Sequence, residues 1–110
     1  MSLFRKKISL IPKQHITLGE FNPEVQGGYE NVKTFPLEVR KGRGLTVRVD
    51  AKDPVDIAIS DYEGRVVKFE EGVTSTTLGP IVFDRKFTAA LVLGIFRGDK
   101  TEVEIEAWLD

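Results

Sequence analysis

The stretch that decides the fold is FPLEVRKGRGLTVRVDAKDPVDIAIS, residues 35–60. Apolar residues occupy every second position in three groups of three, and the positions between them are mostly polar. Because successive side chains of a strand point to opposite faces of a sheet, this alternation predicts three β-strands, each with one apolar face. The two breaks, RKGRG and AKDP, have the composition of turns. The apolar groups are Phe35, Leu37 and Val39, then Leu45, Val47 and Val49, then Val55, Ile57 and Ile59.

Extended segments continue on both sides of this stretch. Proline cannot donate a ladder hydrogen bond, so Pro12, directly after the first of them, either ends that strand or confines it to an edge. Pro36 falls inside another, where it indicates an edge, a bulge or a side that faces away from the partner strand. Residues 86–96, KFTAALVLGIF, are apolar on both faces, which is typical of a central strand or one whose outer face is covered. We predict strands at residues 4–11, 15–21, 29–39, 44–51, 55–60, 65–70, 86–96 and 101–110, with a loop at 71–79 that grades into a short apolar run at 81–83.

This spacing of strands predicts the fold class. Short strands separated by turn signals at intervals of roughly 8–12 residues are typical of sandwiches and barrels. We therefore expect an all-β protein, an antiparallel β-sandwich of jelly-roll or Greek-key type with about eight strands and no significant helix. Residues 1–14 are expected to form an N-terminal arm or an edge strand, and residues 15–110 a single β-sandwich domain.

Composition excludes several classes of protein. The net charge of −1, from 16 basic and 17 acidic residues, argues against a dedicated nucleic-acid binder. The chain has no cysteine, which rules out disulfides and thiolate chemistry. No segment approaches the ~18 apolar residues of a membrane span. We expect a cytoplasmic protein from the sequence as it stands, and an extracellular one if the sequence is a trimmed piece of a longer chain.

The order of these motifs resembles a known family. The segments FPLEVRKG (residues 35–42), LTVRV (45–49) and PVDIAISD (54–61) are similar to those of GOLD-type and bacterial pre-peptidase C-terminal β-sandwiches. The closing AALVLGIFRGDKTEVEIEAW resembles the last two strands of that family. The resemblance implies a small all-β accessory or interaction domain without a catalytic motif.

The sequence contains no recognisable catalytic or cofactor motif. His15 is the single histidine, so any Ser-His-Asp triad would have to use it, and no G-x-S-x-G elbow is present. One histidine and no cysteine also make a structural zinc site very improbable. We predict no cofactor and no catalytic residue.

Acidic residues give two further hypotheses. Asp50 and Asp53 flank the same end of a predicted strand, which makes them weak calcium ligand candidates, although aspartates also favour turns. Glu102, Glu104 and Glu106 form a stripe on one face of the last strand. The stripe is expected to be a solvent-facing row with an arginine such as Arg48 opposite it. In a small carboxylate-based hydrolase, Glu104 would instead work together with Asp50.

Aromatic residues suggest a binding surface. Trp108 shares the face of the glutamate stripe, so it is expected either to be partly exposed or to pack under the N-terminal arm. With Tyr62, it could line a carbohydrate or protein surface. Val92 and Phe96 add apolar character on both faces of their strand, which motivates the hypothesis that the protein self-associates. The residues that we predict to line a ligand or partner surface are Trp108, Glu102, Glu104, Glu106 and Tyr62.

From these observations we predict a non-catalytic binding or protein-interaction module that includes self-association among its roles. The expected partner is a protein or a second copy of the chain, and carbohydrate is the next candidate. The alternatives are a carbohydrate-binding or surface accessory domain and, behind them, the small carboxylate-based hydrolase.

Overall fold

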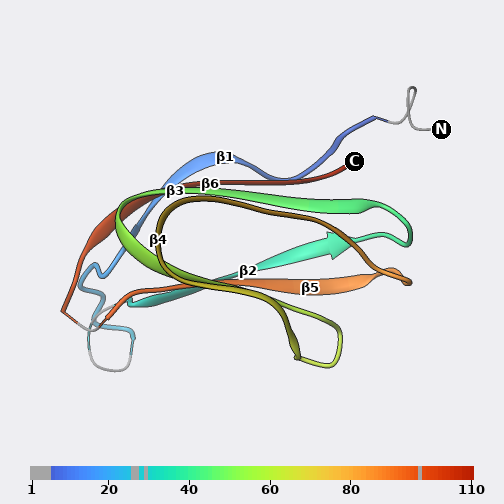
Figure 1. Cartoon of the computed structure of the whole chain (residues 1–110). Coiled ribbons are helices and arrows are strands. Elements are labelled where there is room, and N and C mark those ends of the chain that lie inside the picture. The colour runs from blue at the N-terminus through green and yellow to red at the C-terminus, as the bar shows by residue number, and fades with distance from the viewer. Residues whose placement is uncertain (1–5, 26–27, 29, 97) are drawn as a thin grey trace.

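The computed structural model describes residues 6–25, 28, 30–96 and 98–110. These residues form six antiparallel strands joined in one sheet, and no helix occurs among them (Figure 1). The all-β prediction is therefore confirmed, but the number of strands is six and not about eight. The strands are β1 (Ile8–Leu18), β2 (Val32–Val39), β3 (Gly44–Ser60), β4 (Val66–Val82), β5 (Phe87–Gly94) and β6 (Thr101–Leu109).

The strand β3 organises the sheet because it pairs with three others. It pairs with β4 along one side over nearly its whole length. On its other side it pairs with β6 from Leu45 to Ala51 and with β5 from Asp56 to Ser60. The order of strands is β1-β6-β3-β5-β2, with β4 beside β3.

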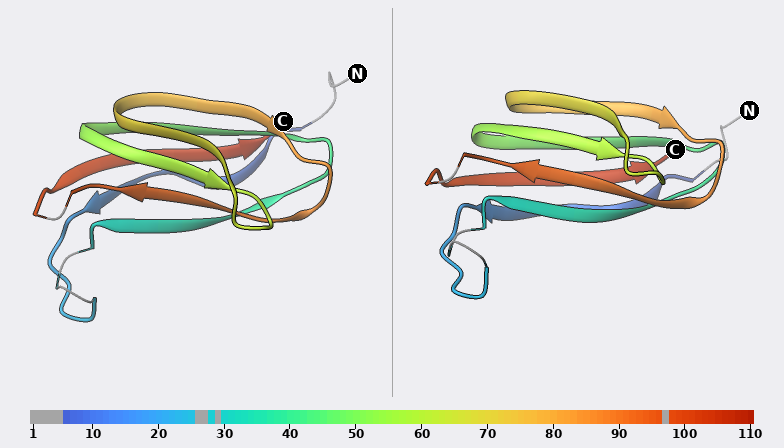
Figure 2. Two further views of the ribbon diagram at one scale, coloured as in Figure 1. Left: turned by 60° about the horizontal axis from the view of Figure 1, so that its bottom comes forward. Right: turned by 90° about the horizontal axis from the view of Figure 1, so that it is seen from below.

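The sheet curls over at the middle of β3 and β4, as Figures 1 and 2 show. Its first half contains β1, β6 and the beginning of β3, and its second half contains β2, β5 and the end of β3. This is one continuous curled sheet, and the sandwich of jelly-roll or Greek-key type that we predicted is not confirmed. β1 and β2 lie close together on one side of the molecule, and β4 runs along the opposite side (Figure 2).

The core lies on the inner face of the curled sheet, where the alternating apolar residues meet. Nine apolar residues define the alternating pattern of residues 35–60. Eight of them are at most 1 % exposed, and Phe35 is partly buried against the others. Strands β5 and β6 contribute alternate residues to the same cluster. These are Ala89, Leu91 and Leu93 from β5, and Val103, Ile105, Ala107 and Leu109 from β6.

The prediction of a turn at AKDP was wrong, because these residues continue β3 through its bend. Pro54 interrupts no ladder there: pairing with β6 ends at Ala51, and pairing with β5 begins at Asp56. The ladder with β4 also shifts register between Asp50 and Val55. A proline is tolerated in a strand where no hydrogen bond from its nitrogen is needed.

The loop predicted at residues 71–79 was also wrong, because β4 follows the bend of β3 as a single strand of 17 residues. At the N-terminus, β1 runs from Ile8 to Leu18 and crosses the boundary we placed after residue 14. The first five residues of the expected arm lie outside the described part of the chain.

Edge positions are confirmed for Pro12 and Pro36, and a central position for most of residues 86–96. Pro12 lies inside β1 and does not end a strand, Pro36 lies in β2, and among the described residues each of these strands pairs with one other strand. β5, which spans most of residues 86–96, lies between β3 and β2. Within the described residues, no helix has the length and apolar character needed to cross a membrane.

Candidate functional site

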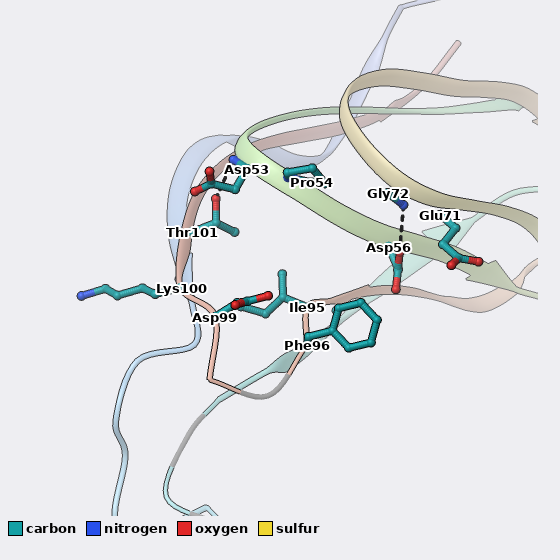
Figure 3. A pocket seen from close by; sticks show the side chains of 11 residues that line it. Asp53, Pro54, Asp56, Glu71, Gly72, Ile95, Phe96, Asp99, Lys100 and Thr101 are labelled. Carbon is teal, nitrogen blue, oxygen red and sulfur yellow. Dashed lines mark hydrogen bonds between the residues drawn. The ribbon is translucent and has the colours of Figure 1, made fainter.

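A groove of about 480 Å³ opens at the end of the molecule where β3 and β4 bend (Figure 3). Three segments that are distant in sequence form its walls: the bend of β3, the bend of β4 and the connection between β5 and β6. The curling of the sheet brings these segments together. The groove is therefore a consequence of tertiary structure.

The groove is acidic on its walls and aromatic at its rim. Four carboxylate side chains line it, whereas its one basic residue, Lys100, extends away from them in Figure 3. Phe96 is 80 % exposed and lies beside the half-buried Ile95. The groove can thus offer a cationic group both negative charge and an aromatic surface. The four acidic residues are Asp53, Asp56, Glu71 and Asp99.

Two hydrogen bonds fix the backbone around the groove. The Gly72 amide donates to Asp56 Oδ1 at 2.9 Å, which joins the bends of β4 and β3. The Asp53 amide donates to Thr101 Oγ1 at 2.9 Å, which joins the bend of β3 to the start of β6. Asp56 and Thr101 therefore stabilise the shape of the groove, while Asp53 and Asp99 are better placed to meet a ligand.

Sequence reasoning found only part of this groove. From the sequence, Asp53 is a calcium ligand candidate or a turn residue, and Phe96 contributes apolar character alone. Glu71 and Asp99 were not singled out. The sequence offered no signal for Phe96 at the rim, because residues 86–96 were predicted as one strand and only the structure shows that β5 ends at Gly94.

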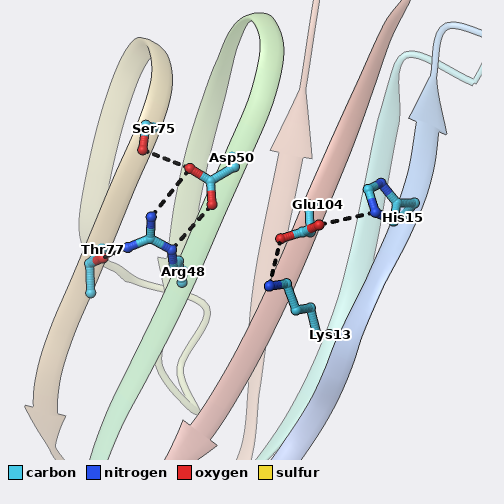
Figure 4. A network of polar contacts seen from close by, with 7 residues as sticks. All are labelled: Lys13, His15, Arg48, Asp50, Ser75, Thr77 and Glu104. Atoms are coloured by element: carbon cyan, nitrogen blue, oxygen red, sulfur yellow. Dashed lines mark hydrogen bonds and ion pairs between the residues drawn. The ribbon is translucent and has the colours of Figure 1, made fainter.

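A second polar cluster covers the outer face of the first half of the sheet (Figure 4). Glu104 on β6 pairs with two residues of β1: His15 Nε2 lies 3.0 Å from Oε2, and Lys13 Nζ lies 3.3 Å from Oε1. On β3, Asp50 accepts hydrogen bonds from Ser75 Oγ at 2.7 Å and from Arg48 Nε at 3.1 Å. Arg48 lies opposite Glu106 in the ladder between β3 and β6, as expected for an arginine facing the glutamate stripe, but its guanidinium bonds to Asp50.

The geometry of this cluster does not favour a hydrolase. Asp50 and Glu104 are direct neighbours in the ladder between β3 and β6, and with His15 they line a shallow hollow of about 340 Å³. The hydrogen bond from Ser75, helped by the charges of Arg48 and Lys13, lowers the pKa of Asp50. A general acid needs a raised pKa and shelter from water. The side chain of His15 is 77 % exposed.

The other residues of the predicted stripe are placed as follows. Glu102 is exposed and Glu106 is partly buried, each on the outer face of β6. Trp108 lies beneath Lys7, whose Nζ atom is 3.9 Å from the ring centroid, so the expected packing under the N-terminal segment is found.

Tyr62 lies in the turn between β3 and β4, whereas Trp108 is on β6. Arg85 covers one face of the Tyr62 ring at 4.0 Å, and Phe87 meets the ring edge-on at 5.6 Å between centroids. A hydrogen bond with Glu63 raises the pKa of the Tyr62 hydroxyl. Because cations cover both candidate rings and the rings belong to different halves of the sheet, they do not form one carbohydrate-stacking platform.

The weak calcium candidates are not brought together. Asp50 belongs to the polar cluster on the outer face, whereas Asp53 lines the acidic groove. In the part of the chain that the structure describes, no group of three or more His, Asp or Glu side chains could hold a metal ion.

Comparison with known proteins bears on the fold. A scan against protein-family models found no match, and a search of curated proteins found none either. Among solved structures, the chain is similar to PliG of Aeromonas hydrophila, a periplasmic inhibitor of g-type lysozyme. The TM-score is 0.58 at 7 % sequence identity, over 94 % of this chain and 87 % of PliG. This likeness shows a shared fold.

Proposed function

We propose that this chain is a non-catalytic protein-binding module, and that the acidic groove with Phe96 at its rim is its contact surface. The observation that carries the proposal is the exposure of Phe96, at 80 %, next to four carboxylates in one concave surface. Exposed aromatic residues anchor protein interfaces, and charges around them select the partner. The partner expected here presents lysine or arginine side chains.

The likeness to PliG supports a protein partner over a small substrate. PliG is a protein that binds another protein, the g-type lysozyme it inhibits, and it is periplasmic. A lysozyme is therefore the first partner to test. The same likeness favours the extracellular alternative of our two predicted locations. The resemblance to GOLD-type and pre-peptidase C-terminal domains stays a prediction.

The first test is calorimetric titration of the protein with a g-type lysozyme, together with an assay of lysozyme activity. We expect binding that Phe96→Ala weakens by at least about tenfold, because loss of an aromatic anchor removes about 1.4 kcal/mol or more of binding free energy. The double variant Asp53→Asn/Asp99→Asn should bind more weakly than the wild type. The ratio of the two dissociation constants should grow as the salt concentration is lowered. Val82→Ala is the matched control, since Val82 is 65 % exposed at the C-terminal end of β4, ten positions from the groove residue Gly72.

The second test does not depend on the choice of lysozyme. A photoreactive phenylalanine analogue is placed at position 96 or at position 82 in the protein, expressed in its source organism. We expect a discrete adduct with one protein from position 96 alone, competed by unlabelled wild type and not by Phe96→Ala. Absence of lysozyme binding together with identical adducts from both positions would contradict the proposal.

A further inference from the structure

One edge of the sheet is open along β4. Strand β4 pairs with β3 on one side, and on its other side it pairs with no strand of the described chain. Such an edge presents unpaired backbone amides and carbonyls to solvent and can pair with a second chain. Figure 2 shows β4 along the side of the molecule opposite β1 and β2, so its outer edge is accessible.

The first part of β4 is a free edge segment of the described sheet that contains no proline. The edge strands β1 and β2 contain Pro12 and Pro36, and the second part of β4 contains Pro80. Proline removes a ladder donor and is one of the devices that protect an edge from pairing. Residues 66–72 of β4 carry no such protection, and we call them the open edge segment.

The open edge segment is also unusually apolar for an exposed strand. Val66 and Phe69 are each 57 % exposed, and Val67 is 38 % exposed. Phe69 lies opposite Ala58, which in turn lies opposite Val92, so these three side chains form an apolar row on the outer face of the second half. The row ends at the free edge, where Phe69 has no cross-strand neighbour on its other side.

We propose that two copies of this chain pair through their open edge segments as an antiparallel homodimer with its two-fold axis at Phe69. A two-fold axis perpendicular to a sheet sets one residue against its own copy and keeps the faces of both strands aligned. With Phe69 at the centre, residue 68 faces residue 70 and residue 66 faces residue 72. The pairing extends across all seven residues of the segment.

Charge complementarity selects this register. With Phe69 at the axis, Lys68 of each copy faces Glu70 of the second copy, so the dimer gains two opposite-charge cross-strand pairs. No other two-fold register places these residues opposite each other. Thr76 Oγ1 donates to Glu70 Oε2 at 2.8 Å and holds this carboxylate on its face of the sheet. On the opposite face, the two Phe69 rings meet and extend the apolar row.

A disulfide test measures the register directly, because the chain contains no cysteine of its own. In the proposed dimer the Cα atoms of residue 69 in the two copies lie about 4.5–5.5 Å apart, within disulfide range. The two copies of residue 66 lie about 20 Å apart, since position 72, which faces position 66 of the second copy, is six residue steps along the strand. Under mild oxidation, Phe69→Cys should form a covalent dimer and the equally exposed Val66→Cys should not.

A charge exchange tests the pairing by sedimentation across a wide range of concentrations. Lys68→Glu sets like charges opposite each other and should raise the dimer dissociation constant by about tenfold, as should Glu70→Lys. The double variant Lys68→Glu/Glu70→Lys should restore the wild-type dissociation constant, which a merely structural role of either residue would not do. Thermal unfolding of each variant confirms that it is folded.

The opposing interpretation is that Lys68 keeps the edge monomeric, since lysine on an edge strand discourages pairing. A strictly monomeric wild type, or Val66→Cys dimers that form as fast as those of Phe69→Cys, would overturn the proposal. The inference goes beyond the proposed partner binding. Glu71 and Gly72 belong to both the open edge segment and the groove, but the residues varied in the two sets of experiments do not overlap. Phe69, Lys68 and Glu70 do not line the groove, and Phe96, Asp53 and Asp99 lie outside β4, so the two proposals can fail separately.

Discussion

Asp50 shows how one outward side chain joins neighbouring strands. It extends from β3, accepts a hydrogen bond from Ser75 on β4, and faces Glu104 on β6. The Ser75 hydroxyl and the Arg48 guanidinium favour the ionised carboxyl, so the pKa of Asp50 lies below its ordinary value of 3.8. The ionised form is therefore the one that stabilises the fold.

We expect Asp50→Asn to lower the free energy of unfolding at neutral pH by less than about 1 kcal/mol, since the side chain is exposed and its contacts are screened. A lowered pKa means that this contribution is present above pH 3.8 and is lost as the pH falls through the folded-state value. The difference in Tm between wild type and variant should therefore shrink with acidification. A difference independent of pH would contradict this, and Glu102→Gln is the control.

The bend of β3 is the element on which the groove depends. Asp53 lies in the stretch between the two ladders of β3, and its amide donates to Thr101 Oγ1. Thr101 is only 4 % exposed, so water has little access to its hydroxyl and does not readily replace this hydrogen bond. The contact thus sets the distance between the bend and the start of β6.

Thr101→Val should lower the free energy of unfolding by about 1 kcal/mol, because the Asp53 amide loses its acceptor while side-chain volume is kept. Thr101→Ser keeps the hydroxyl and should retain this hydrogen bond, at the cost of a buried methyl. Urea unfolding measures the stability of both variants. Hydrogen exchange at the Asp53 amide distinguishes loss of the hydrogen bond from loss of the methyl group, because exchange should accelerate in Thr101→Val alone. Equal protection of that amide in both variants would show that the hydrogen bond is not important.

At the scale of the whole molecule, β3 couples the two halves of the sheet. It pairs with β6 in the first half and with β5 in the second, and its inward residues belong to a single apolar cluster. A destabilising substitution in one half should therefore lower the stability of the other half as well. The single tryptophan, Trp108 on β6, reports on the first half.

Ile57→Ala tests this coupling, because Ile57 is fully buried in the second half and faces Leu93 of β5. We expect a loss of about 2–5 kcal/mol, from lost burial and the cavity that remains. The unfolding curve from Trp108 fluorescence should shift together with the curve from far-UV circular dichroism. Two separate transitions would mean that the halves unfold independently. Val66→Ala, at an exposed position, should change stability by less than about 0.5 kcal/mol.

The residues of the groove were only partly predictable. Asp53 could be assigned to a bend region from its neighbours, because Asp and Pro favour such places locally. Its association with Asp99 and Phe96 could not, since those residues are more than forty positions away in sequence. The surface of the first half was predicted better. Glu102, Glu104 and Glu106 lie on the outer face of β6 and Arg48 lies opposite Glu106, although its guanidinium bonds to Asp50.

The sequence by itself determined the extended conformation and which side chains are buried, because alternation of apolar and polar residues is a local property with a period of two. Leu45, Val47 and Val49 could only face inward together. Tertiary structure alone decided that the two strands predicted on either side of AKDP are one, that the sheet curls, and that a groove opens at its bend. These features depend on which strands pair with β3 and where each ladder stops, and pairing between distant segments leaves no mark on the local pattern.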